Sequence, residues 1–129
     1  MNKRFPVFFP EWCPPNDARE EAIDVFRMTK KNNFSSDDFY SHVILFPDRE
    51  DFKKIDKAYG LSVYKDANDL IKQRKRVPNL RNNWKFTAKG KTLPDCGVVK
   101  ETPTNKNSHI TWWIYDGAEP HNNFSSVDI

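Results

Sequence analysis

The chain has 129 residues and a formal net charge of +3, a length that suits one domain with a real core and is too short for two. Hydrophobic residues make up only 37% of it and aromatic residues 14%, so we expect a core built from a few large side chains. No apolar run reaches the length of a membrane span, and prolines interrupt the apolar residues near the N-terminus where a secretory signal would need them. We therefore expect a single cytoplasmic domain with no membrane partner.

The two cysteines give no sign of a metal site or a disulfide. Cys13 and Cys96 are far apart in the sequence, and neither has a partner at metal-ligand spacing. In a reducing compartment such cysteines are expected to be buried thiols. We expect no bound metal.

The first 17 residues combine prolines with large apolar side chains. Four prolines oppose a regular helix or a central strand. The apolar set argues against a free tail and consists of Phe5, Val7, Phe8, Phe9 and Trp12. We expect an extended arm over residues 1–17 that lies across the domain and covers part of its core.

The next segments carry one strand signal and two helix signals. Residues 23–29 are interpreted as a first strand, although a short helix beginning near Asp17 would take its front half. The sequence Ser-Ser-Asp-Asp at 35–38 predicts a helix start, because a hydroxyl and acids complement the free N–H groups of a first turn. A second start at 48–51 leads to a helix stopped by Gly60. The inward faces of these two helices would carry Phe39, Val43 and Phe46, then Phe52, Ile55 and Tyr59.

The second half of the chain is richer in strand signals. Asp66 is expected to cap a third helix that ends before Pro78, since a residue preceding proline avoids the helical region. Strand patterns cover 61–64, 84–88, 97–100 and 108–115. We expect 84–88 and 97–100 to pair with each other. The polar segment 117–129 is expected to be a loosely ordered tail.

This order of elements favours one fold class. An arm, a strand, two helices, a strand, a helix and a run of strands fit an α+β domain over residues 1–129, with a mostly antiparallel sheet and about three helices. A doubly wound parallel sheet is excluded by the same order.

His109 is the strongest candidate for chemistry. It opens the clearest strand, between Ser108 and Thr111, and a general acid or base benefits from a shielded imidazole with hydroxyl partners. Side chains alternate along a strand, so His109, Thr111 and Trp113 should share one face. The alternative is a structural histidine that bonds to the loop 102–107.

Several familiar sites are absent from the sequence. It contains no GxGxxG, Walker loop, HExxH or GxSxG pattern, which excludes the common nucleotide-hydrolase and zinc-protease signatures. Of the other two histidines, His42 is expected on a helix surface and His121 in the tail, where neither has an assigned role.

Positive charge is concentrated in one block. Residues 1–69 carry a formal charge of −2 and residues 70–129 carry +5, and the stretch 71–94 contains eight Lys or Arg and no acid. Such a block attracts phosphates or acidic surfaces. Its candidate contacts with phosphate or nucleic acid are Arg74, Lys75, Arg76, Arg81 and Lys85, with Trp84 among them as in single-strand grooves. Equally, its helical half is explained as a solvated face.

The C-terminal half resembles a group of small uncharacterised bacterial proteins. The resemblance implies no activity, and it rests on the spaced residues Gly60-Leu-Ser-Val63, Ala67, Arg76-Val-Pro78, Leu80-Arg81, Ala88-Lys-Gly90, Gly97-Val98, Thr102-Pro103, Ser108-His109 and Thr111-Trp-Trp113.

A second resemblance implies a ligand. Arg27 on a first strand, followed by a Gly-Leu-Ser-Val-Tyr strand and an alanine-bearing helix, resembles the split core of ADP-ribosyltransferase-like proteins. In that family an Arg or His on the first core strand and a Ser or aromatic residue on the second hold the dinucleotide, and a Glu on a later strand assists transfer. The resemblance implies that Arg27 meets a phosphate or ribose of NAD, that Ser62 supports it and that Tyr64 stacks on nicotinamide. The Glu has no counterpart, because Glu101 precedes a loop and Glu119 lies in the tail.

Three interpretations follow. The first is a pocket that binds a nucleotide or another phosphate-bearing ligand, with His109 as acid or base and Arg27 as charge stabiliser. It requires these two side chains to share a cavity and to lie on the same side of the sheet. The second is a non-enzymatic module whose basic block 72–91 binds nucleic acid or an acidic protein. The third is a subunit of a bacterial or phage conflict system that docks through residues 5–12. The pocket of the first interpretation would be formed by Arg27, Ser62, Tyr64, Thr111, His109 and Trp113.

Overall fold

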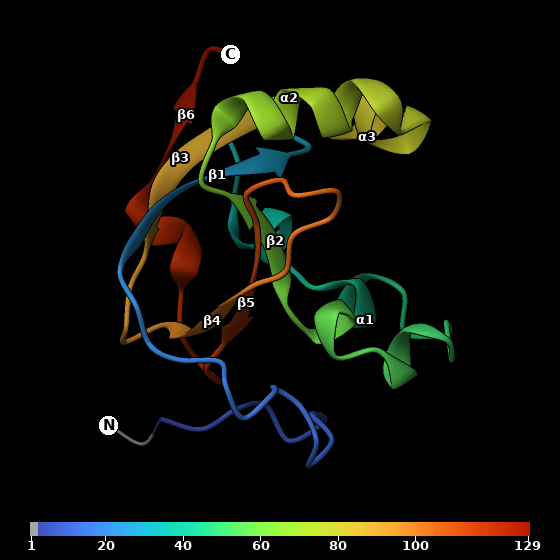
Figure 1. The fold of residues 1–129 in the computed structure, drawn as a ribbon, viewed down its shortest axis with the longest axis vertical. Coiled ribbons are helices and arrows are strands. Elements are labelled where there is room, and N and C mark those ends of the chain that lie inside the picture. Colours follow the sequence, from blue (N-terminus) through green and yellow to red (C-terminus); the bar gives the residue numbers. More distant parts are fainter. Residues whose placement is uncertain (1–2) are drawn as a thin grey trace.

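The computed structural model describes residues 3–129 and contains a six-stranded antiparallel sheet with the order β4-β5-β2-β1-β3-β6. The strands are β1 (Ile23–Thr29), β2 (Leu61–Tyr64), β3 (Phe86–Thr92), β4 (Gly97–Glu101), β5 (His109–Ile114) and β6 (Phe124–Val127). The α-helices are α1 (His42–Leu45), α2 (Ala67–Arg76) and α3 (Pro78–Asn83), and the 3-10 helices are η1 (Ser36–Phe39), η2 (Phe52–Lys54), η3 (Asp56–Tyr59) and η4 (Pro120–Asn123). This architecture (Figure 1) confirms the α+β class with a mostly antiparallel sheet and about three helices.

The sheet divides into two halves between β1 and β2. β3 pairs with β1 along the whole of that strand, whereas β2 pairs with β1 only at Phe26↔Tyr64. β2 pairs along its full length with β5. The half-sheets β4-β5-β2 and β1-β3-β6 therefore meet at one residue pair and diverge beyond it.

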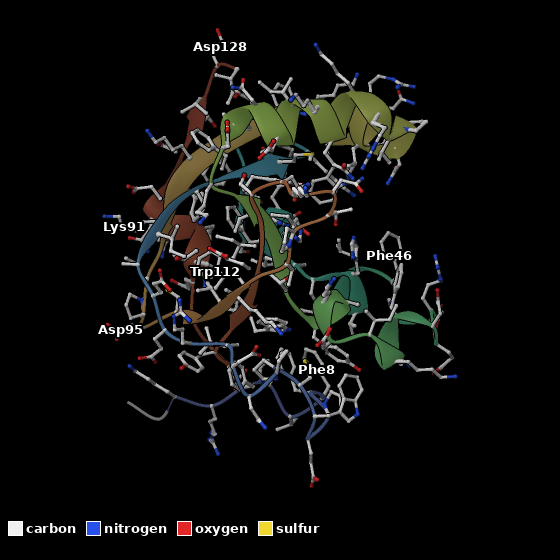
Figure 2. All side chains as sticks on the ribbon, in the orientation of Figure 1. Phe8, Phe46, Lys91, Asp95, Trp112 and Asp128 are labelled. Carbon is white, nitrogen blue, oxygen red and sulfur yellow. The ribbon has the colours of Figure 1, made fainter. Side chains whose placement is uncertain are left out.

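The main hydrophobic core lies on one face of the sheet. Its completely buried side chains come from four strands and include Val25, Val63, Ala88, Ile110 and Trp112. Figure 2 labels Trp112 among them. η1 and β6 contribute Phe39 and Phe124, whose ring centroids lie 5.0 Å apart. Trp112 thus fills the apolar face that strand alternation predicts for it.

The N-terminal arm covers a second apolar cluster, which contains the buried Trp113. Phe5 and Phe9 pack against this cluster, and the rings of Phe9 and Tyr59 lie 5.3 Å apart. In Figure 1 the arm runs below β4 and β5 at the bottom of the view. Residues 1–2 of the expected arm lie outside the described residues. Both cysteines are free and buried, as predicted.

The segment 35–60 forms short turns instead of the two helices that we expected. None of η1, α1, η2 and η3 exceeds four residues. The carbonyl oxygen of Asp38 accepts hydrogen bonds from Arg27 in place of a helical bond from four residues further on, and Ser41 then caps a new turn by accepting from the N–H of Ile44. The prediction was wrong because a side chain from a distant strand occupies the backbone acceptor that the helix needed.

The expected inward faces of this segment are correct only in part. Phe39, Val43 and Tyr59 are buried, but Phe46 and Ile55 are 46% and 45% exposed. The break in the helix rotates the later turns, so the spacing that would have aligned these side chains is lost.

Helix α2 begins and ends where we predicted. The Asp66 carboxylate accepts a hydrogen bond from the N–H of Asn68 at 2.9 Å, which is N-terminal capping, and the helix ends at Arg76. Pro78 then begins α3, a helix that we did not predict, because proline suits the first position of a helix.

Two expectations for the last third of the chain are wrong. β3 pairs with β1 and β6, and β4 pairs with β5 instead of with β3. The segment 117–129 contains η4 and β6, and β6 extends the sheet beyond β3. Gly90 permits this pairing, because a Cβ atom there would lie 2.5 Å from the carbonyl oxygen of Asn123 and from the ring of Phe124. Phe124 is the one buried position of β6. The sequence of β6 therefore lacks the alternation of apolar and polar residues that would predict a strand.

Candidate ligand-binding cavity

A cavity of about 460 Å³ opens where the two half-sheets diverge. Residues of β1, β2, α1, α3 and the start of β5 line it. In Figure 1 the α2–α3 unit lies above this region and the α1 region below it, and Figure 2 shows Phe46, a lining residue, on the α1 side. Four residues singled out from the sequence line the cavity together, namely Arg27, Ser62, Tyr64 and His109.

Arg27 contributes a buried charge to the cavity wall. It is 6% exposed. Its Nε and Nη2 groups donate to the carbonyl oxygen of Asp38 at 3.1 and 2.9 Å, and its Nη1 group donates to that of Ser62 at 2.9 Å. Burial lowers the pKa of Arg27 to about 10, and the charge of Asp38 opposes this shift. The side chain is therefore cationic at neutral pH.

The guanidinium of Arg27 is not fully used by the protein. It has five N–H donors, and its three bonds leave two of them without an acceptor among residues 3–129. Within that range it also forms no ion pair with a carboxylate. A buried cation in this state is stabilised by an anion that reaches it.

The strand register directs the side chains of Arg27 and His109 to opposite faces of the sheet. Phe26 is opposite Tyr64, and Tyr64 is opposite His109, so these three share a face and Arg27 leaves from the other. Arg27 nevertheless reaches the cavity, because its guanidinium extends toward the carbonyl of Ser62 where the half-sheets diverge. Both side chains therefore line one cavity, but the expectation that they lie on the same side of the sheet is wrong, because strand register places them on opposite faces.

The hydrogen-bond partners of the His109 ring both belong to Thr102. Nδ1 lies 3.0 Å from the carbonyl oxygen of Thr102 and 2.7 Å from its hydroxyl. A carbonyl only accepts, so the bond to the Thr102 carbonyl forms in the tautomer that carries its proton on Nδ1, and in that tautomer Nε2 has the free lone pair of the neutral ring. Burial lowers the pKa of His109 although the bond to Thr102 opposes the shift, which keeps the ring neutral at pH 7. Nε2 is therefore available as a proton acceptor.

Thr111 and Trp113 do not line the cavity. Thr111 is buried, and its hydroxyl lies 2.8 Å from that of Thr102. It thus supports the residue that orients His109. The indole N–H of Trp113 donates to the carbonyl of Asp56 at 2.8 Å within the second apolar cluster. Alternation was predicted correctly for this strand, but its far end is covered by other elements.

Aromatic rings and a second cation complete the wall. Lys30 Nζ lies 5.0 Å from the ring centroid of Trp84, and the Arg27 guanidinium lies 5.9 Å from the same ring. Tyr40 and Tyr64 also line the cavity. Burial raises the pKa of Tyr64 to about 12, so its hydroxyl stays protonated. Lys30, Tyr40 and Trp84 were missed as cavity residues because the turns that bring them together depend on distant contacts.

His42 is a further lining residue that the sequence did not reveal. Its ring stacks on Phe52 at 5.3 Å. Burial lowers the pKa of His42, and the charges of Arg27 and Arg49 lower it further. In the described part of the chain no Asp or Glu lines the cavity, so every formally charged side chain in its wall is cationic.

The residues of the predicted basic contact have two different roles. Arg74 is partly buried and holds α2 to the start of β3 by donating to the carbonyls of Trp84 and Phe86 at 3.0 and 2.9 Å. The others are exposed, namely Lys75, Arg76, Arg81 and Lys85. Arg81 donates to the carbonyl of Lys75 at 2.7 Å, which ties α3 to the end of α2.

Comparison with known proteins adds no assignment. No known family, curated protein or solved structure matches this chain. Over residues 3–129, no three His, Cys, Asp or Glu side chains are grouped so that they could hold a metal ion. The helices of the same range are all too short or too polar to cross a membrane.

Proposed function

We propose that the cavity binds a nucleotide or another phosphate-bearing small ligand. The observation that carries this proposal is the charge of the wall, which combines the buried Arg27 with Lys30 and contains no carboxylate among the described residues. Buried charges are normally paired, and a phosphate provides the missing partner for the two unused N–H groups of Arg27.

The size and the aromatic content of the cavity favour a nucleotide over a simple anion. Its volume of about 460 Å³ lies in the range of roughly 300 to 1,000 Å³ that is usual for small-ligand sites. Tyr40, Tyr64 and Trp84 offer faces or edges on which a base packs, while Asn79 and Asn83 offer amide groups to its polar edges.

NAD is the nucleotide to test first. The resemblance to ADP-ribosyltransferase-like proteins assigns dinucleotide contacts to Arg27, Ser62 and Tyr64, and all three line the cavity. Group transfer from NAD would break the bond between ribose and nicotinamide and form a bond to an acceptor hydroxyl. Nε2 of His109 is the available base for the hydroxyl proton, and Arg27 would stabilise phosphate charge.

A thermal-shift series tests binding. Phosphate-bearing ligands (NAD, ADP and AMP) should raise the Tm through preferential binding to the native state, whereas adenosine should have a weaker effect. Lys30→Gln should reduce the shift. Lys31→Gln is the matched control, because Lys31 is the next residue but pairs with Asp37 on the exposed surface.

Two outcomes would contradict the proposal. One is the absence of any shift with millimolar NAD, ADP and AMP. The other is an equal shift for the Lys30→Gln and Lys31→Gln variants, which would place the phosphate elsewhere. Transfer chemistry is checked separately, by release of nicotinamide from NAD and by its loss in His109→Gln.

A further inference from the structure

The α2–α3 unit carries a group of cations that form no ion pair within residues 3–129, although α2 also contains Asp69 in its first turn. These are Lys72, Lys75, Arg76, Arg81 and Lys85, all exposed. The nine ion pairs within residues 3–129 involve none of them, although they do involve eight cations elsewhere. The protein therefore pairs its positive charges over much of its surface but leaves them unpaired here.

Helix electrostatics explain only part of this group. Cations in the last turns of α2 and α3 complement the negative ends of the helix dipoles. That effect falls off within one turn, so it does not explain Lys72, which is earlier in α2, or Lys85, which lies beyond α3. It also does not explain why the stretch 71–94 contains no acid. Unpaired like charges repel one another, which is consistent with a polyanionic partner.

The two helices that carry this basic surface also line the cavity. Gln73 of α2 and Asn79, Leu80 and Asn83 of α3 line the cavity, so one side of the α2–α3 unit faces the site while the same helices carry the cations. The charges of Arg76 and Asp69, both on α2, act on the pKa of the lining residue Tyr64 in opposite directions. A ligand that extends out of the cavity along this unit would meet the unpaired cations next.

We propose that the ligand is the terminal nucleotide of a single-stranded nucleic acid, whose following phosphates lie on the α2–α3 surface. This inference rests on the proposed nucleotide site. Single strands are bound by positive surfaces combined with aromatic side chains on which bases stack, and the cavity and α2–α3 supply both parts. A duplex end would not present an unstacked base to the cavity, and an acidic peptide would have no use for its aromatic wall.

Fluorescence anisotropy with a 12-nucleotide single strand tests the inference. The Kd of the strand should be at least 10-fold lower than the inhibition constant of AMP as a competitor. The affinity for the strand should fall as the salt concentration rises, because binding releases counterions. The triple variant Lys72→Gln, Lys75→Gln, Lys85→Gln should lose at least 10-fold in strand affinity, with a shallower salt slope and an unchanged AMP-induced Tm shift. None of these three lysines makes a side-chain hydrogen bond within residues 3–129, so folding should be preserved.

The matched control carries the same charge change on other surfaces. Lys53→Gln, Lys54→Gln, Lys100→Gln should retain strand affinity within about twofold. A circular strand of the same sequence should bind at least 10-fold more weakly than the linear one, because it has no end to insert.

The outcomes separate this inference from the proposed function. Equal binding of circular and linear strands, equal effects of the two triple variants, or equal binding of an acidic peptide of the same length would overturn the strand-end inference while the nucleotide site stands. If neither AMP nor the strand binds in a way that depends on Lys30, the proposed function fails and the inference fails with it.

Discussion

Arg27 and the carbonyl oxygen of Asp38 are joined by two hydrogen bonds, of 3.1 and 2.9 Å, from Nε and Nη2 of the same guanidinium. The Asp38 side chain meanwhile accepts from the backbone N–H of Lys30 at 2.9 Å. Asp38 thus binds the backbone after the end of β1 through its carboxylate, and it positions the Arg27 guanidinium through its own backbone carbonyl. This relationship both breaks the expected helix and positions the charge on which the proposed function depends.

Arg27→Lys should destabilise the fold. A lysine ammonium lacks the planar fork that serves Asp38 and Ser62 at once, so at least one buried carbonyl would lose its donor. Loss of such a hydrogen bond costs about 1 to 3 kcal/mol, which urea unfolding would detect. Arg19→Lys is the control, because Arg19 is exposed and pairs with Glu21 on the surface. Equal stability of the two variants would contradict a bridging role for Arg27.

Stability should decrease as the pH falls below about 6.5, the ordinary pKa of histidine. Burial lowers the pKa of both His42 and His109 in the folded state. The unfolded chain therefore takes up protons first on acidification, which favours unfolding. Above the unfolded pKa both states are neutral at these positions, so stability should be constant there.

Urea unfolding at pH 7.5, 6.5 and 5.5 measures this dependence. His42→Gln and His109→Gln should each flatten the profile in that window, whereas His121→Gln provides the comparison at a third histidine. A rise of stability on acidification would contradict neutral rings at His42 and His109.

The tautomer of His109 should be visible by nitrogen NMR, with a proton on Nδ1 and a bare Nε2. Thr102→Val removes the hydroxyl but keeps the backbone carbonyl, so the tautomer should persist. Stability should fall by about 1 kcal/mol for each of the hydroxyl's two lost contacts, with Thr111 and with Nδ1 of His109. Protonation on Nε2 in either protein would remove the proposed base.

Gly90→Ala should detach β6 from the sheet. The new methyl group would lie 2.5 Å from the Asn123 carbonyl and the Phe124 ring, and relief of such overpacking costs about 1 to 3 kcal/mol. Hydrogen exchange should become faster at residues 124–127 before it does in β2 and β5. Gly117→Ala serves as a comparison, since a Cβ atom there meets nothing within 4 Å and the cost comes from its φ of +81°.

Local sequence patterns were sufficient to predict the elements whose buried and exposed positions follow the periodicity of a strand or helix. β1, β2, β5 and α2 follow from alternation, β-branched runs and the Asp66 cap, because in each case the stabilising contacts match the local pattern. The pairing of β3 and the existence of β6 depend on contacts between distant segments, such as Phe124 with Phe39. Local pattern contains no information about those contacts.

The candidate site was predictable to the same extent. Arg27, Ser62, Tyr64 and His109 lie on strands that the sequence identifies, and all line the cavity. His42 and Trp84 reach it from turns whose geometry is set by the Asp38 contacts and by α3, so their chemistry could not be inferred from spacing. The basic residues were predicted as one group, but Arg74 has a structural role, because its guanidinium donates hydrogen bonds to backbone carbonyls at and before the start of β3.

The single pairing of β1 with β2 at Phe26↔Tyr64 has a mechanical consequence. Residues of both half-sheets line the cavity. A ligand that contacts both would hold them together where the sheet has the fewest strand-pairing contacts. Binding should then slow amide exchange at Phe26 and Tyr64 more than within β3 or β5, and the protein would report occupancy through the rigidity of its own backbone.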